Sequence, residues 1–406
     1  MYRVLYDLII RLYIGLIRGV SYFHAKAALF ISGRKLPWPV PEEKQSVWIH
    51  VSSLGEFEQA RPVIEQLRKK TDLDITLTFF SPSGYEIRKN YDQADRVLYM
   101  PFDTRQNAKK FFDHYNFNLI LFVKYDFWMG HLIEGIKRQI PIIFISVIFR
   151  SNQFYFKLGR PFYLPVFKSF NHFFVQNEET KSVLSDHGVV NVTVVGDTRM
   201  DRVLQIANQA QKIELFEQLD ETRKLFVIGS AWKSDIEFLK PIFQSYGGDF
   251  LFVIAPHNIS EQSISQLIAE LPNYQRYSKY QSNQPCDYLI IDNMGMLASL
   301  YSYAYFTYVG GAFRGALHNT IEAAAHGKPV FFGYHENNTK FAEAKGLVGI
   351  GAGFECSTSN TIIEQINHML SDEKYLKMVC DNARDYVKQN SGATDQIVNY
   401  LIEQLK

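Results

Sequence analysis

The chain has 406 residues, 47% of them hydrophobic and 21% charged, which suits two or three globular domains and excludes a disordered or fibrous protein. Its 43 Lys and Arg against 42 Asp and Glu give a net charge of +1, so a general nucleic-acid binder is not expected. Cys286, Cys356 and Cys380 are too widely spaced to predict a disulfide framework or a metal-binding pair, which fits a reducing compartment.

Residues 1–36 are strongly basic and rich in apolar side chains. The apolar run is interrupted too often to predict a helix that spans a bilayer. At about 100° per residue, Arg3, Asp7, Arg11 and Arg18 share one face of a helix and apolar residues cover the rest. We predict an amphipathic helix lying in a membrane interface, with arginines toward anionic headgroups. The alternative is a helix docked on the protein's own core.

Closely spaced prolines at 37–41 end this segment, because a helix cannot continue through them. Short apolar runs then alternate with helix-like stretches, which predicts parallel sheets covered on both faces. The expected strands are 47–51, 75–79, 97–100, 119–123, 142–147, 173–176, 192–195, 225–228, 250–254, 288–291, 305–309 and 330–332. A polar stretch at 201–222 separates the two series. The fold class is therefore α/β, with two doubly wound domains, 37–205 and 206–406, whose strand ends would face a ligand cleft.

The first motif, His50-Val-Ser-Ser53-Leu-Gly55-Glu56, follows the first strand, and a helix is expected to begin at Leu54. Ser53 and Glu56 have the spacing of a capping box, which explains both residues without any function. A carboxylate at a strand end is equally a candidate general base. The sequence leaves both interpretations open.

The second motif runs from Gly310-Gly311 to His318-Asn319-Thr320-Ile321-Glu322 and also joins a strand to a helix. Its glycines would let the backbone approach a phosphate, and a helix amino terminus offers N–H groups to the anion. Glu322 could accept hydrogen bonds from a ribose diol, although Asn319 and Glu322 also fit a helix cap. The pattern is neither a dinucleotide fingerprint nor a P-loop.

Smaller polar groups follow other predicted strands, and together they indicate a pocket. They are Gly196 to Met200, Gly229-Ser230-Ala231-Trp232, Ala255-Pro256-His257-Asn258 and Asp292-Asn293-Met294-Gly295-Met296.

In this order, the motifs HxxSxGE, an acidic-Trp segment, GxxK/R, AP followed by His, DxMG and VGG…HNxxE resemble the 3-deoxy-D-manno-oct-2-ulosonic acid (Kdo) transferases of lipopolysaccharide synthesis. The resemblance extends from the amino-terminal segment to about Cys356. It implies the two-domain glycosyltransferase-B (GT-B) fold, CMP-Kdo as donor and a lipid A precursor (lipid IVA) as acceptor. It also implies an inverting transfer without cofactor or essential metal, at the cytoplasmic face of the inner membrane.

Carried over residue by residue, the resemblance makes Glu56 the catalytic base, assisted by Asp126 and Arg199. It assigns donor binding to the later strand ends, namely Ser230, Pro256, His257, Met294, Gly295, Met296, Gly310, Gly311, His318, Asn319, Thr320, Ile321 and Glu322. We assign acceptor binding to Ser53, Gly55, Arg150 and Arg160. Arg150 and Arg160 lie in segment 149–170, where aromatic and cationic residues are interleaved. One interpretation is that this segment binds the acceptor, and the other is that it forms a buried aromatic helix pair.

The chain departs from the family pattern at several positions. The family's Glu-Thr-Glu-Leu-Trp-Pro is Lys124-Tyr-Asp126-Phe-Trp-Met here, its Lys is Arg199, and its Arg in the segment after AP is His257. Two alternatives therefore stay open. One is another GT-B sugar transferase or a nucleotide-sugar epimerase, and the other is a catalytically reduced sugar-nucleotide-binding protein at the membrane surface. The oligomeric state and the number of Kdo units transferred do not follow from the sequence.

Overall fold

The computed structural model describes residues 2–406, which form two compact units. The first contains the chain up to Asp201 together with Ser391–Lys406, and the second is Arg202–Asn390. The predicted second domain included residues 391–406. They fold instead with the first unit, because apolar side chains of the last helix, α18 (Ala393–Gln404), enter the core of that unit.

The first unit is built on a seven-stranded parallel sheet with the order β3-β2-β1-β4-β5-β6-β7. Its central strands are fully buried, as their continuous apolar runs predict for a sheet covered on both faces. The strands are β1 (Ser46–Val51), β2 (Asp74–Phe79), β3 (Arg96–Tyr99), β4 (Leu119–Val123), β5 (Ile142–Val147), β6 (His172–Val175) and β7 (Val192–Val194). The helices are α1 (Tyr2–Val20), α2 (Ala25–Ser32), α3 (Leu54–Lys70), α4 (Pro82–Arg88), α5 (Arg105–His114), α6 (Met129–Lys137), α7 (Arg160–Phe167), α8 (Glu178–Asp186) and α18, while α9 (Thr198–Asn208) leads into the second unit.

The second unit repeats this architecture, with a parallel sheet in the order β10-β11-β9-β8-β12-β13-β14. Its strands are β8 (Lys224–Ala231), β9 (Phe250–Pro256), β10 (Tyr274–Arg276), β11 (Tyr288–Ile290), β12 (Ala304–Val309), β13 (Val330–Gly333) and β14 (Gly353–Cys356). Its helices are α10 (Glu214–Thr222), α11 (Lys233–Tyr246), α12 (Glu261–Ile268), α13 (Leu297–Leu300), α14 (Ile321–Ala325), α15 (Ala342–Gly349), α16 (Ser359–Ser371) and α17 (Glu373–Gln389).

Every predicted strand is present, and the predicted α/β class of two doubly wound sheets is confirmed. Two strands were missed, β10 and β14. Both lie at the edges of the second sheet, and both are only three or four residues long without a continuous apolar run. An edge strand pairs on one side only, so it does not need the apolar run by which buried strands are recognised.

The segment 149–170 contributes mainly to the core of the first unit. Phe149, Phe156, Phe167 and Phe170 are buried in one aromatic cluster together with Phe127. The cations of the segment stay at the surface, where Arg150 and Arg160 are exposed. The structure therefore corresponds to the buried aromatic interpretation for most of these rings.

Helix α1 presents two apolar faces. Ile10 and Ile14 are buried against the first unit, as in a helix docked on its own core. The opposite face is exposed; we call its four most regularly spaced members, Leu5, Leu8, Leu12 and Leu16, the α1 strip. Among the described residues, no helix is long and apolar enough to cross a membrane.

Arg34 fastens these amino-terminal helices to the sheet. Its guanidinium lies 3.9 to 5.2 Å from the ring centroids of Phe30, Phe80, Tyr99 and Phe102. It donates hydrogen bonds of 2.7 to 2.8 Å to three backbone carbonyls at α2 and at the ends of β2 and β3. Burial lowers its pKa to about 9. The aromatic ring faces and the backbone carbonyls stabilise the positive charge of Arg34 in place of a counter-ion.

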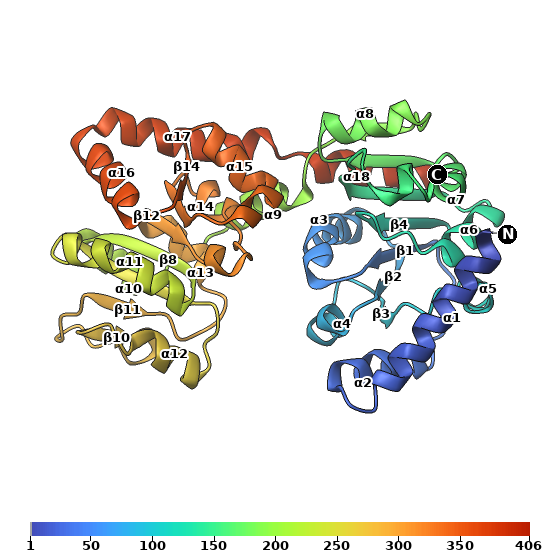
Figure 1. Ribbon diagram of the computed structural model, residues 1–406, viewed down its shortest axis with the longest axis horizontal. Helices are drawn as coiled ribbons and strands as arrows, with labels where there is room; N and C mark the ends of the chain where they lie inside the picture. The colour runs from blue at the N-terminus through green and yellow to red at the C-terminus, as the bar shows by residue number, and fades with distance from the viewer. Residues whose placement is uncertain (1) are drawn as a thin grey trace. The chain divides into compact units, whose positions relative to one another are not determined.

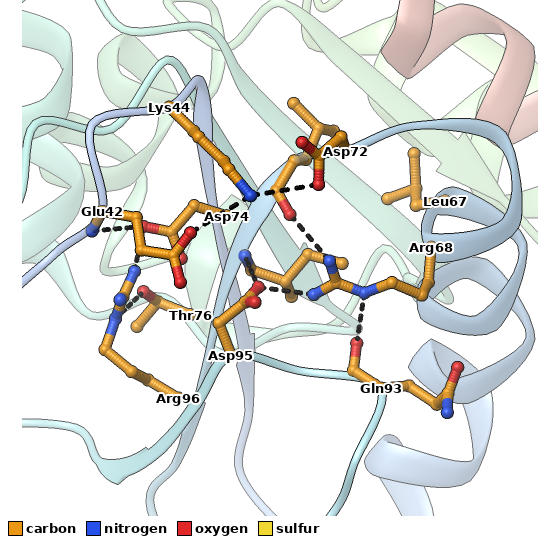
Figure 2. Close-up of polar contacts among 12 residues, drawn as sticks. Glu42, Lys44, Leu67, Arg68, Asp72, Asp74, Thr76, Gln93, Asp95 and Arg96 are labelled. Carbon is orange, nitrogen blue, oxygen red and sulfur yellow. Dashed lines mark hydrogen bonds and ion pairs between the residues drawn. The ribbon is translucent and has the colours of Figure 1, made fainter.

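The amino-terminal edge of the first sheet carries a polar network (Figure 2). The buried side chains of Arg96 and Asp74 form an ion pair, and Arg96 also donates to Thr76, its register partner on β2. Asp74 in turn accepts the backbone N–H of Glu42, which holds the proline-rich segment against the sheet. Because this edge lies opposite the strand ends that carry the motifs, we assign it to stability.

Candidate active site

Glu56 lies in the first turn of α3, directly after β1. The helix begins at Leu54 as expected, and Ser53 precedes it in an extended conformation. The Glu56 carboxylate accepts the backbone N–H of Ser52 at 2.5 Å and that of Ser53. Ser53 makes no side-chain capping bond, so only the glutamate half of the expected capping box is present. The carboxylate is thus fixed by backbone donors while the helix turn leaves it partly accessible.

Asp126 lies beside Glu56, because β4 is the neighbour of β1 in the sheet and both side chains follow the strand ends. Ser52 connects the two acids: its N–H donates to Glu56 and its hydroxyl donates to Asp126. Lys124, which begins the same loop as Asp126, has a positive φ of 59°. Such a conformation is costly for a residue with a side chain and is typical of functional strand ends.

The surroundings of Glu56 make it a weak acid. Burial and the negative charge of Asp126 raise the pKa of Glu56 from 4.5 to about 7, against the lowering effect of the Ser52 N–H and Lys124. Two carboxylates in one site cannot both ionise easily, so one holds its proton to higher pH. A pKa near the working pH is what a general base requires.

A chain of polar contacts leads from Trp48 to Asp126. Trp48 Nε1 donates to Thr78 Oγ1, which lies 2.8 Å from Nδ1 of the fully buried His50, and Nε2 of His50 lies 3.2 Å from Asp126. Burial lowers the pKa of His50, so the ring is neutral. A carboxylate can only accept, so we assign the single ring N–H to Nε2 and the Thr78 hydroxyl as donor to Nδ1. The sequence analysis included His50 in the motif but gave it no role.

Arg199, another predicted site residue of the first unit, forms an ion pair through its guanidinium. It donates to the buried carboxylate of Asp197 at 2.7 and 2.9 Å, and Gln59 donates to the same carboxylate. This pairing lowers the pKa of Asp197 despite its burial. Gly55 is exposed, and a Cβ placed there would meet only Ser53 Oγ at 4.0 Å. There is consequently open space in front of the first turn of α3.

In the second unit, Gly310 and Gly311 are required by the packing of their own loop. A Cβ on Gly310 would lie 2.6 Å from the Ser230 carbonyl, and one on Gly311, where φ is +94°, would lie 2.5 Å from the Ala316 carbonyl. The buried carboxylate of Asp235 organises this region, since it accepts the N–H groups of Trp232 and Gly311. These two glycines are therefore needed for close packing of the loop against the Ser230 and Ala316 carbonyls.

The end of the second motif forms a short helix, α14, which begins at Ile321 after Thr320. Asn319 accepts the N–H of Ile321 at 3.2 Å, and its amide donates to Glu322 at 3.0 Å. Asn319 thus serves the start of the helix, as the capping interpretation expects. Glu322 is partly buried, and its carboxylate is held by the Asn319 amide.

Three aromatic rings and one cation stack at the ends of β8, β9 and β12. Trp232 stacks on His257 with 4.3 Å between centroids, and His257 stacks on His318 at 4.5 Å. The guanidinium of Arg314 lies 4.1 Å above the Trp232 ring. Burial and the neighbouring His257 lower the pKa of His318 to about 4, so His318 is neutral at physiological pH. Trp232 and Arg314 were not among the predicted site residues.

Beside this stack lies a cavity of about 370 Å³ lined by Trp232, Pro256, Phe313 and Arg314. The structure thus brings Pro256, His257 and His318 together, as the motifs predict, and Ser230 bends the end of β8 with a φ of +52°. The segment Met294-Gly295-Met296 follows the neighbouring strand β11, where Met294 is 76% exposed. No group of three or more His, Cys, Asp or Glu arranged for a metal ion occurs within residues 2–406.

Known proteins resemble the chain over most of its length. A family model described as 3-deoxy-D-manno-octulosonic-acid transferase (kdotransferase) matches residues 30–202. A 3-deoxy-D-manno-octulosonic acid transferase of Rickettsia felis is 24% identical over 384 residues, covering 91% of this chain and 82% of that protein. The corresponding enzyme of Aquifex aeolicus is 23% identical over 341 residues, covering 82% and 89%.

Solved structures share the fold at low sequence identity. UDP-GlcNAc 2-epimerase from Neisseria meningitidis has a TM-score of 0.60 and 18% identity, covering 88% of this chain and 100% of that one. MurG from Acinetobacter baumannii has a TM-score of 0.58 and 14% identity, covering 88% and 99%. The two parallel seven-stranded sheets and these neighbours show an α/β fold of the GT-B type. Residues 30–202 match the 3-deoxy-D-manno-octulosonic acid (Kdo) transferase family model, and the chain is similar to Kdo transferases over most of its length.

Proposed function

We propose that this protein transfers Kdo from CMP-Kdo to a lipid A precursor, with inversion at the anomeric carbon and Glu56 as the general base. The observation that carries the proposal is the raised pKa of Glu56, about 7, in a carboxylate held by backbone N–H groups next to open space at Gly55. At neutral pH a substantial fraction of Glu56 is ionised and able to take a proton.

In the proposed reaction, an acceptor hydroxyl attacks the anomeric carbon of Kdo. A new C–O bond forms there, the bond to the CMP phosphate breaks with its electron pair, and the hydroxyl proton passes to Glu56. Asp126 strengthens Glu56 as a base through its negative charge. The same charge would stabilise the positive charge that develops at the anomeric carbon. Ser52 and His50 hold Asp126 for this role.

We assign the donor nucleotide to the strand ends of the second unit. The Trp232–His257–His318 stack offers flat ring faces, and Arg314 offers a cation for the departing phosphate. Glu322 is the candidate partner for the ribose hydroxyls. Arg199 is a weaker candidate for the phosphate than the sequence indicated, because its guanidinium already pairs with Asp197.

We place the enzyme at the cytoplasmic face of the inner membrane, bound peripherally through α1. The α1 strip supports this proposal, since it leaves apolar side chains in contact with solvent on a helix that also carries Arg3, Arg11 and Arg18. Apolar residues of this kind enter the acyl boundary while cations contact anionic headgroups.

The decisive experiment is mass spectrometry of the product formed from CMP-Kdo and a tetra-acylated, bis-phosphorylated glucosamine disaccharide. The parent protein should add the mass of Kdo, and Glu56→Gln should do so about 10²–10⁴-fold more slowly. Calorimetry should give binding of CMP in preference to UDP. A preference for UDP, or full activity of Glu56→Gln, would refute the donor or the base, respectively.

A further inference from the structure

A cavity of about 510 Å³ in the first unit is lined by residues of α1, α5 and α6, and we call it the α1 pocket. Figure 1 shows where these three helices lie. Its walls are largely apolar and include Val4, Ile133 and Phe162. Met129 and Gly130 also line it, and they follow closely after Asp126 in the chain. The pocket therefore adjoins the loop that carries one of the two acids of the candidate active site.

The carboxylates around the α1 pocket already have partners. The buried carboxylate of Asp103 accepts the Tyr6 hydroxyl at 2.6 Å and the N–H groups of Gly130 and His131 at 2.8 Å. Asp7 accepts from Arg11 at 2.6 Å and from the backbone N–H of Arg105 at 3.0 Å. Glu134 is bonded to the neighbouring cations of its own helix. The first N–H of α5 is thus satisfied from within the protein.

Three cations at the rim form no ion pair with a carboxylate whose side chain the structure describes. They are Arg3, Arg105 and Lys109, of which Arg105 lies near enough to Asp7 to contribute to the lowered pKa of that carboxyl group. They come from two helices, α1 and α5, so they surround the opening rather than follow one surface. This excess of positive charge above an apolar cavity suits a molecule that is anionic at one end and apolar at the other.

The position of the pocket indicates how such a molecule would arrive. Val4 lines the cavity and is 75% exposed, and it continues into the α1 strip on the same side of the helix. When the α1 strip enters the acyl boundary of a membrane, the cationic rim is brought to the depth of the phosphates. A phosphate dissolved in water would gain nothing from the apolar walls, whereas a phosphate carried by a lipid would.

We propose that the α1 pocket binds the phosphate group of a lipid, with Arg3, Arg105 and Lys109 as its ligands. The inference rests on the proposed action at a membrane. The lipid is either the phosphorylated acceptor or a surrounding anionic phospholipid; both present the same group, and the two sources differ in the assays that they affect.

The test uses the double variant Arg105→Ala/Lys109→Ala in the full chain. Its control, Lys110→Ala/Lys69→Ala, removes the same charge from exposed positions outside the pocket. Binding is measured on phosphatidylcholine vesicles with and without phosphatidic acid. The KM for the phosphorylated acceptor is measured in neutral detergent micelles. Because all four side chains are exposed, unfolding temperatures should match the parent, which is checked first.

Loss of charge-assisted hydrogen bonds to phosphate should weaken one of these interactions by roughly tenfold or more. A loss on phosphatidic acid vesicles with the acceptor KM unchanged identifies surrounding phospholipid as the ligand. A raised acceptor KM with kcat retained identifies the acceptor phosphate. If the pocket variant behaves like the control in both assays, the proposal is wrong. The vesicle assay does not depend on turnover, so its outcome is separate from that of the proposed reaction.

Discussion

Replacing Glu56 by Gln should stabilise the folded protein at neutral pH while it slows catalysis about 10²–10⁴-fold. Burial and Asp126 raise the pKa of Glu56 from 4.5 to about 7, so the folded protein holds this proton more tightly than the unfolded chain does. At about 1.4 kcal/mol for each pH unit, the difference amounts to about 3 kcal/mol. That is the cost of ionising Glu56 in the folded state, and Gln never incurs it.

The sign of the effect follows from proton linkage. Between pH 4.5 and about 7 the folded protein binds more protons at this site than the unfolded chain, so the contribution of Glu56 to the free energy of unfolding falls as pH rises. Below pH 4.5 parent and variant should be equally stable. Above pH 7 the variant should be more stable by up to about 3 kcal/mol, roughly 6–12 °C in unfolding temperature for a unit of this size.

Calorimetric unfolding at a series of pH values measures this difference directly. The surface variant Glu43→Gln is the control, because Glu43 is exposed and should show no such trend. A stability difference between Glu56→Gln and the parent that does not change with pH would refute the assigned environment of Glu56. So would a variant that is less stable than the parent at pH 8 and equal to it at pH 5.

Three further changes test other parts of the structure. Asp126→Asn removes the charge that raises the pKa of Glu56, so the acid limb of the rate against pH should move from about 7 to lower pH, with a slower maximum rate. Asp74→Asn leaves the buried Arg96 without its counter-ion and should lower the free energy of unfolding by about 3–5 kcal/mol in denaturant titrations. Arg314→Ala should weaken CMP binding by roughly tenfold in calorimetry while the stability of the protein stays near that of the parent, because Arg314 is exposed.

A specific result would contradict each of these three predictions. An unchanged acid limb in Asp126→Asn would mean that Asp126 does not act on Glu56. Asp72→Asn, at an exposed member of the same polar network, should change stability by less than about 0.5 kcal/mol, and an equal loss in both variants would contradict the assigned importance of burial. CMP binding that survives Arg314→Ala intact would move the phosphate to another part of the second unit.

The sequence predicted the fold well where the signal is local. Buried parallel strands require continuous apolar runs, and each such run became a strand. Helix α3 begins at Leu54, where the Glu56 carboxylate accepts a backbone N–H in the first turn. The capping-box spacing that predicts this helix start also identified Glu56 as the candidate base. The edge strands β10 and β14 carry no apolar run, so nothing in their residues distinguished them from loops.

The candidate site was only partly predictable because its geometry depends on contacts between distant segments. The partnership of Glu56 and Asp126 follows from the adjacency of β1 and β4, which the strand order decides. Arg314 and Trp232 are more than 80 residues apart and meet only through the packing of the second sheet. Arg199 looked like an available cation, whereas Asp197, two residues before it, neutralises its charge. A polar residue in a strand-end loop can be predicted to lie near a ligand site. Its hydrogen-bond or ion-pair partner cannot be predicted from the local sequence.

The return of α18 to the first unit has a consequence for how the protein is made. Ala393, Ile397, Val398 and Leu401 pack in one core with residues of β1 and α3, and Asp201 holds the start of α18 by accepting the N–H and hydroxyl of Thr394. During synthesis the first unit therefore emerges with this side of its sheet uncovered. It cannot be completed until the whole second unit has been synthesised and α18 has emerged from the ribosome. The second unit, which is contiguous in the chain, can fold earlier, so the part of the protein that is translated first is the last to mature.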